Sequence, residues 1–307
     1  MATDIWDVIL FTPGAPLIDI SKGDVPGNYA RFQVSSKHLT LASAYFRRML
    51  KDCWIPINDC EPNILLIILN LIHGRSRQVP WKLSLPELTD IAVATDFFQC
   101  HEAIEVFARI WINNLEPLLS SSFSEDTKRW MMIAWVFKSN DILQETEEIA
   151  IQQGRGPFQT INLPIPKSIK DRIDEARQQH METLQVMIAV RLERLLTSSS
   201  AEQKSCCNPE CDAAYLGLIL RTLTKNKISY AAASIPSHSN KPHSPLFAVS
   251  FGSLSPTSIE SMVKNWNFKS PPCGSSRCAN EATPFGGDVA YKARHLPTLL
   301  QDSENSS

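Results

Sequence analysis

Short apolar runs and helix-spaced apolar positions alternate along the first third of the chain. The run at residues 7–11 predicts a strand, because Thr12-Pro13-Gly14 follows it and a Pro-Gly pair is a strong turn signal. A second short strand is expected over residues 31–34. Ser35 or Ser36 is then expected to cap a helix whose apolar positions recur at helical spacing. These positions are Leu39, Ala42, Tyr45, Phe46 and Met49.

Three more helices are predicted before residue 115. Pro62 suits a first turn, and residues 64–72 are apolar on almost every side, which predicts a helix buried all round. Ser84 and Glu87 form a capping box that opens the next helix. Residues 102–114 carry a further apolar face. The first 115 positions therefore indicate two or three short strands and four or five helices.

The second part of the chain is expected to be mainly helical. Helices are predicted over residues 127–137, from a cap at Asn140 or Asp141 to 151, from a cap at Ser168 to about 196, and over 212–223. The longest of them has one stripe of positions three or four apart, which we expect to be buried. The stripe consists of Ile169, Ile173, Ala176, His180, Leu184, Met187, Arg191 and Leu195.

Beyond Lys225 the composition changes, since Ser and Pro recur through most of the remaining chain. Such a segment has few apolar residues to offset the entropy of ordering. We therefore expect residues 226–307 to be a largely disordered tail, with short ordered pieces near 247–251 and 263–268.

Composition excludes several classes of protein. The 307 residues are 43% hydrophobic and 20% charged, which is ordinary for a globular chain and unlike a fibrous or wholly disordered one. The formal net charge of −2 gives the whole chain no electrostatic attraction to nucleic acid or an anionic membrane. No apolar run approaches the roughly 20 residues of a membrane span, and the opening residues lack a secretory pattern. A soluble protein of the cytoplasm or nucleus is therefore expected, with its 8 cysteines reduced.

Several motifs, taken in order, resemble the BTB/POZ family, in particular its fungal members. In that family the segment matched by residues 32–39 is a strand followed by a helix. The resemblance extends over about residues 5–223. The segments that carry it are FQVSSKHL at 32–39, Ala42-Ser43, FRRML at 46–50, LNLIHGR at 69–75, residues 88–98, CHEA at 100–103, and residues 130–166 with the connector Leu163-Pro164-Ile165-Pro166.

The chain also departs from that family in three respects. The first strand begins within the opening ten residues, so the extra N-terminal helix and strand through which many BTB domains dimerise are expected to be absent. Residues 51–61 form a short segment compared with many relatives. We find no convincing copy of the hydrophobic-x-Glu turn that supports cullin docking, so a cullin partner is implied by the resemblance alone.

Zinc binding is one alternative that the cysteines leave open. Cys207 and Cys211 are four positions apart, and Cys273 and Cys278 are five apart, whereas strong zinc signatures have tighter pairs. Unpaired thiols are therefore favoured over a zinc site, and no metal or cofactor is predicted. Cys207 and Cys211 are expected in a loop that leads into the last helix. The buried-thiol interpretation also applies to Cys53, Cys60 and Cys100.

No motif for catalysis is present in the sequence. It contains no nucleophile elbow, dinucleotide fingerprint or phosphate-binding loop, and the serines near His38 are better explained as helix caps. Trp111, Trp130 and Trp135 have the spacing of core residues. Trp54 and Trp81 instead lie in connecting segments, where an exposed aromatic ring is a candidate anchor for a partner protein.

The fold class predicted from these patterns is α+β. A small BTB/POZ-like α/β domain at 1–115 is followed by a helical region at 116–225 and by the tail. The resemblance implies a non-enzymatic adaptor or scaffold for other proteins, with a substrate adaptor of a cullin ubiquitin ligase as one form. A transcription-associated regulator and a zinc-stabilised structural module are the alternatives. The partners, the pathway and the oligomeric state are left open.

Overall fold

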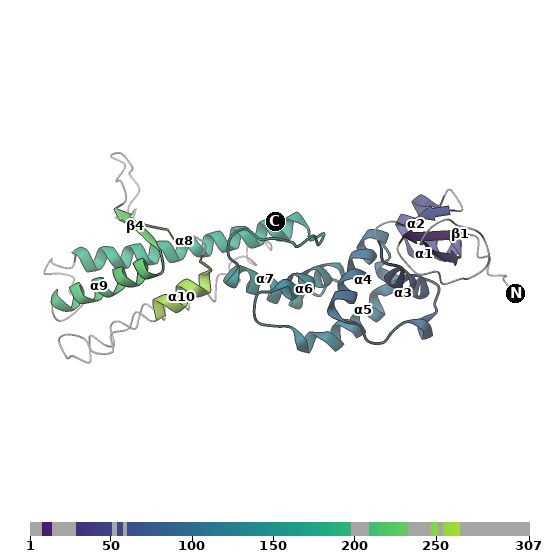
Figure 1. Ribbon diagram of the computed structural model, residues 1–307, viewed down its shortest axis with the longest axis horizontal. Coiled ribbons are helices and arrows are strands. Elements are labelled where there is room, and N and C mark those ends of the chain that lie inside the picture. Colours follow the sequence, from purple (N-terminus) through teal and green to yellow (C-terminus); the bar gives the residue numbers. More distant parts are fainter. Residues whose placement is uncertain are drawn as a thin grey trace, which may run out of the picture. The chain divides into compact units, whose positions relative to one another are not determined.

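A computed structural model describes residues 8–13, 29–50, 54–57, 60–197, 209–232, 247–250 and 254–264 (Figure 1). These residues are mainly helical, with a few short strands. The chain divides into two compact units. The first comprises Met1–Glu147 with Thr160–Ile165, and the second comprises Glu148–Gln159 with Pro166–Ser307.

The first unit contains a three-stranded sheet, in the order β2-β1-β3. Strand β1 (Val8–Pro13) pairs antiparallel with β2 (Tyr29–Val34) and parallel with β3 (Trp54–Pro56). The first two strands lie where the sequence predicted them. Trp54, however, belongs to β3 and pairs with Ile9, so the prediction that it lies in a connecting segment was wrong.

The helix expected after β2 is divided into two at Ser43. Helix α1 (Ser36–Ala42) ends there, and α2 (Ala44–Met49) begins, because Ser43 has an extended backbone and its hydroxyl accepts a hydrogen bond from the N–H of Phe46. The same hydroxyl donates to the carbonyl of Phe98. Ser35 occupies the cap position of α1, but its side chain makes no capping hydrogen bond, contrary to expectation.

Three longer helices complete the part of this unit before residue 116. They are α3 (Pro62–Ile72), α4 (Leu85–Phe98) and α5 (His101–Leu115). Two short 3₁₀ helices, η1 (Ser76–Gln78) and η2 (Glu116–Leu118), follow α3 and α5. Each of the predicted starts at Pro62 and at the Ser84–Glu87 capping box is confirmed.

The core of the first unit lies between these helices. The rings of Phe46 and Phe98 stack with their centroids 5.2 Å apart, and both are fully buried. Helix α6 (Glu125–Val136) packs against α4 and buries Trp130 in the same unit. The division expected near residue 115 therefore falls inside this unit, at η2.

The second unit is built on one long helix. Helix α8 (Lys167–Thr197) packs against α9 (Pro209–Lys225) and α10 (Pro256–Lys264), and strands β4 (Ser229–Ala232) and β5 (Phe247–Ser250) pair antiparallel. Ser168 is the second residue of α8 and therefore does not precede the helix as its cap. The predicted stripe of α8 is buried at most of its positions. The core of this unit includes Leu184, Ile188, Leu192, Ile219, Leu223 and Ile259.

One of the pieces described after residue 225 matches an expected ordered segment in position. β5 lies within the predicted piece near 247–251, whereas α10 precedes most of the piece predicted at 263–268. Residues 226–228 and β4 also lie in the predicted tail and are described, whereas residues 233–246, 251–253 and 265–307 lie outside the described residues. Within the described residues, no helix combines the length and the apolar run needed to cross a membrane.

Helix α7 (Asn140–Gln153) ends at a glycine that the packing requires. A Cβ atom at Gly154 would lie 2.4 Å from the carbonyl oxygen of Ala150, which is closer than real Cβ contacts. That oxygen already accepts the N–H of Gly154 at 2.9 Å. Gly217, within α9, has no atom within 4 Å of an added Cβ.

Candidate functional site

Trp81 is the predicted partner-binding residue whose surroundings can be described. It follows η1, and its side chain is 61% exposed. The indole packs on the ring of Phe107 from α5, with the centroids 5.5 Å apart. The carbonyl of Pro80 accepts a hydrogen bond from Trp111 Nε1 at 2.8 Å, and the carbonyl of Trp81 accepts one from Asn114 Nδ2 at 3.3 Å. These two hydrogen bonds attach the backbone of Pro80 and Trp81 to α5, while most of the indole stays exposed to solvent.

Phe107 of α5, which contacts the indole, has an exposed apolar residue before it in the sequence. Val106 precedes Phe107 and is 68% exposed, while Phe107 is half-buried. An exposed Trp held by backbone hydrogen bonds loses little conformational entropy on binding, which favours it as an anchor. The side chain of Trp54 is not among those that the structure describes, so its role as an anchor for a partner stays a prediction.

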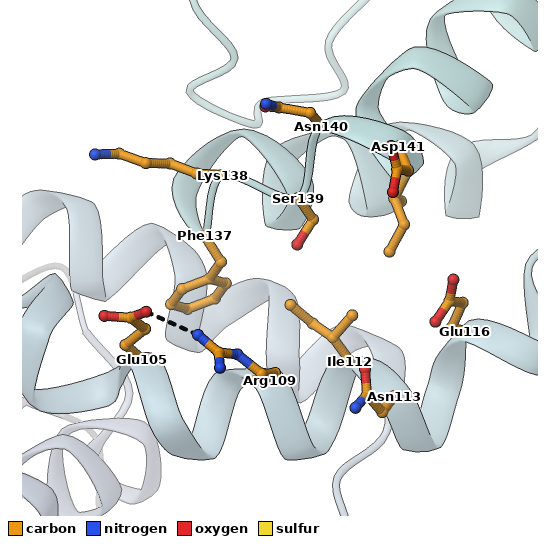
Figure 2. A pocket seen from close by; sticks show the side chains of 11 residues that line it. Glu105, Arg109, Ile112, Asn113, Glu116, Phe137, Lys138, Ser139, Asn140 and Asp141 are labelled. Atoms are coloured by element: carbon orange, nitrogen blue, oxygen red, sulfur yellow. Dashed lines mark hydrogen bonds and ion pairs between the residues drawn. The ribbon is translucent and has the colours of Figure 1, made fainter.

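A pocket of about 460 Å³ lies on another side of α5 (Figure 2). Its walls come from α5, the turn between α6 and α7, and the first turn of α7. Ile112, Phe137 and Ile142 provide its apolar surface. Arg109 and Glu105 form an ion pair at 2.9 Å at one end. No pattern in the sequence indicates this pocket.

The turn that forms one wall of the pocket depends on an unusual backbone conformation. Lys138 has a φ of 56°, in the left-handed region that glycine usually occupies after a helix. The N–H of Ser139 then bonds the carbonyl of Ala134 at 2.9 Å, which closes α6. Helix α7 begins at Asn140, so the expected cap at Asn140 or Asp141 is wrong by at least one position. The carbonyl of Ser139 accepts the first backbone hydrogen bond of α7, from the N–H of Leu143.

Of the four candidate zinc ligands, the structure describes one. Cys211 is buried within α9 rather than in the expected loop. Cys207, Cys273 and Cys278 lie outside the described residues, as does Cys53. Among the residues that are described, no three or more His, Cys, Asp or Glu side chains are grouped as metal ligands.

Two other cysteines of the first unit are poor nucleophiles. Burial raises the pKa of Cys60 to about 12, with the nearby carboxylates of Asp90 and Glu61 adding to the effect. Burial likewise raises the pKa of Cys100 to about 12. Because the thiolate is the reactive form, neither thiol is activated for chemistry at neutral pH.

His73 joins two helices of the first unit. Its Nε2 accepts a hydrogen bond from the N–H of Ser35 at 3.1 Å, so its Nδ1 carries the proton and donates to the carbonyl of Leu69 at 2.7 Å. The ring of His38 stacks on it, with the centroids 5.0 Å apart. Both nitrogens of His73 are thus engaged by backbone groups, which makes its role structural.

His180 is buried in the second unit. The residue is 2% exposed, and its Nε2 lies 3.2 Å from Oε1 of Glu260 on α10. The two atoms are close enough for an ion pair, although their angles are not those of a well-aligned hydrogen bond. This pair connects α8 to α10 in the core.

Comparisons with known proteins give no family for this chain. A scan against protein-family models, a search of curated proteins and a search of solved structures each found no match.

Proposed function

We propose that the chain is a non-enzymatic adaptor or scaffold, and that its first unit is a BTB/POZ-like protein-interaction domain. The observation that carries this proposal is the exposed indole of Trp81, which α5 holds through the flanking carbonyls. A partner protein would bury this ring without having to order it first. Large aromatic residues of this kind contribute most of the binding energy at many interfaces.

The local order of elements supports the family part of the proposal. Residues 32–39 span the end of β2 and the start of α1, which is the strand-then-helix arrangement that the resemblance implies. Among the described residues, His73 is engaged by backbone hydrogen bonds, and burial raises the pKa of the Cys60 and Cys100 thiols. An intracellular adaptor, with a cullin among its candidate partners, accounts for these features together.

The proposal is tested by gentle purification of the tagged chain from its native cell type, followed by mass spectrometry. We expect a reproducible set of proteins with the wild type, and at least a fivefold loss of that set with Trp81→Ala. Leu118→Ala is the matched control, because Leu118 is also a large exposed apolar residue of the first unit. Equal recovery with all three chains would contradict the role of Trp81.

The identity of the captured proteins decides between two forms of the proposal. A cullin together with its ring-finger subunit would establish a ubiquitin-ligase adaptor. Other proteins without a cullin would leave a scaffold. Failure to enrich any protein above an untagged control would overturn both.

A further inference from the structure

The pocket of Figure 2 has unpaired negative charge at one end. Glu116 and Asp141 lie at that end, and their side-chain carboxylates make no hydrogen bond or ion pair within the described residues. At the opposite end Arg109 is paired with Glu105, and the side chain of Lys138 extends away from the pocket. The charge available to a bound group is therefore acidic.

The two helix ends at the pocket carry opposite partial charges. Helix α5 ends beside Glu116 and has no basic residue in its last turn, so the partial negative charge of its terminal carbonyls is not offset from within the helix. The N-terminus of α7 carries a partial positive charge of about one half, which the full negative charge of Asp141 in its first turn exceeds. The potential at this end favours a cation over an anion.

The interior of the pocket suits an aliphatic chain. Ile112 and Ile142 are buried, and Phe137 is half-buried beside them. A volume of about 460 Å³ is within the range of ligand pockets and large enough for a long side chain with part of its backbone. Lysine and arginine combine such an aliphatic stem with a cationic head.

We infer that this pocket binds a lysine or arginine side chain of a partner polypeptide. The stem would pack on Ile112 and Ile142, and the head would meet the carboxylates of Glu116 and Asp141. This inference rests on the proposed adaptor function, which supplies the partner chain. It adds a site on the first unit that is distinct in its residues from the Trp81 surface.

The test uses the full chain with ¹³C-labelled isoleucine methyl groups, whose signals from Ile112 and Ile142 are assigned with the Ile→Val variants. The probe is N-acetyl-arginine methylamide. We expect saturable shifts of these two signals, with a Kd on the order of 1 mM for so small a ligand. N-acetyl-norleucine methylamide, which keeps the stem but has no charge, should bind at least fivefold more weakly.

Charge variants identify the residues responsible. The double variant E116Q/D141N should weaken the arginine probe at least fivefold. Glu145→Gln is the matched control, because Glu145 is an exposed carboxylate of α7 that does not line the pocket. Equal binding of the norleucine probe, binding of N-acetyl-glutamate methylamide instead, an equal effect of E145Q, or no shift with any probe would each overturn the inference.

These outcomes are separable from failure of the adaptor proposal. Probe binding without any captured protein would establish the pocket's preference and contradict the adaptor function. Captured proteins that are lost with Trp81→Ala, in a chain that does not bind the arginine probe, would leave the adaptor function standing and refute this site.

Discussion

Each compact unit has a histidine where two elements meet, and the two junctions differ in their partners. His73 in the first unit binds backbone groups of Ser35 and Leu69. His180 in the second unit meets a side chain, Glu260. A backbone carbonyl is present whatever residue occupies its position, and a backbone N–H is missing only from proline, whereas a side-chain partner exists only if the sequence provides it. The first junction therefore depends on one residue, and the second depends on two.

The largest effect is expected where the side-chain partner is removed. Glu260→Gln should destabilise the second unit by about 3 kcal/mol, because the buried imidazole of His180 loses the carboxylate that faces its Nε2 at 3.2 Å. Hydrogen exchange of the α10 amides measures this change. Ser261→Ala, an exposed position of the same helix, is the control. A loss no larger than that of the control would show that the pair contributes nothing to the junction.

The junction with backbone partners should give a smaller loss. His73→Ala should destabilise the first unit by about 2 kcal/mol, since the Ser35 N–H loses its acceptor in a partly buried place. Hydrogen exchange of the α1 amides, measured at increasing denaturant concentration, reports this loss of stability. His38→Phe keeps a ring stacked on His73 and should change little. An equal loss in the two variants would contradict the role given to the hydrogen bonds of His73, because His38→Phe leaves them in place.

Ser84→Ala tests a contact between residues that are close in the sequence. It should destabilise the first unit by about 1 kcal/mol, which is the usual cost of losing an N-cap side chain. Ser84 hydrogen bonds lower the pKa of Glu87. The stability that these hydrogen bonds contribute is therefore fully present above the ordinary glutamate pKa of about 4.3. It is lost as the pH falls through the lower pKa of Glu87 in the folded state. Melting temperatures across this acidic range should show a weaker pH dependence in Ser84→Ala. Ser76→Ala should keep the wild-type dependence.

The smallest effect should be a gain rather than a loss. Burial, reinforced by the carboxylate of Glu61, raises the pKa of Asp90, so its charged form is disfavoured in the folded state. Asp90→Asn should stabilise the first unit by about 0.5 kcal/mol or less at pH 7, because solvent screens a group this exposed. The gain should vanish at acidic pH, where Asp90 is protonated. Glu145→Gln, on an exposed part of α7, should give no such pH-dependent gain.

The elements that sequence patterns located are those specified by neighbours along the chain. The Ser84–Glu87 capping box joins residues three positions apart, and the stripe of α8 that includes His180 follows from helical periodicity. The acidic partner of His180 could not be found in this way, because Glu260 lies far along the chain and on another helix. The same limit applies to His73, whose bond to Ser35 spans 38 positions.

The two candidate sites differ in the same way: one could be recognised from neighbouring residues in the sequence, and the other depends on contacts made by the fold. Trp81 could be singled out as a ring in a connecting segment, although its hydrogen-bonded support from α5 depends on the fold. The pocket could not be anticipated, because it requires α5 to lie beside the turn at Lys138. That turn places a lysine in a conformation for which the sequence pattern would call for glycine.

The two glycines described at the helices of the second unit lead to opposite expectations for natural variation. At Gly154 every other amino acid would push a carbon against the Ala150 carbonyl, so a saturation mutagenesis screen should recover glycine there almost exclusively. At Gly217 the space beside α9 is open, and alanine should be enriched over glycine because it favours the helix by about 1 kcal/mol. A survey of orthologous chains should therefore find glycine conserved at position 154 and several residue types at position 217.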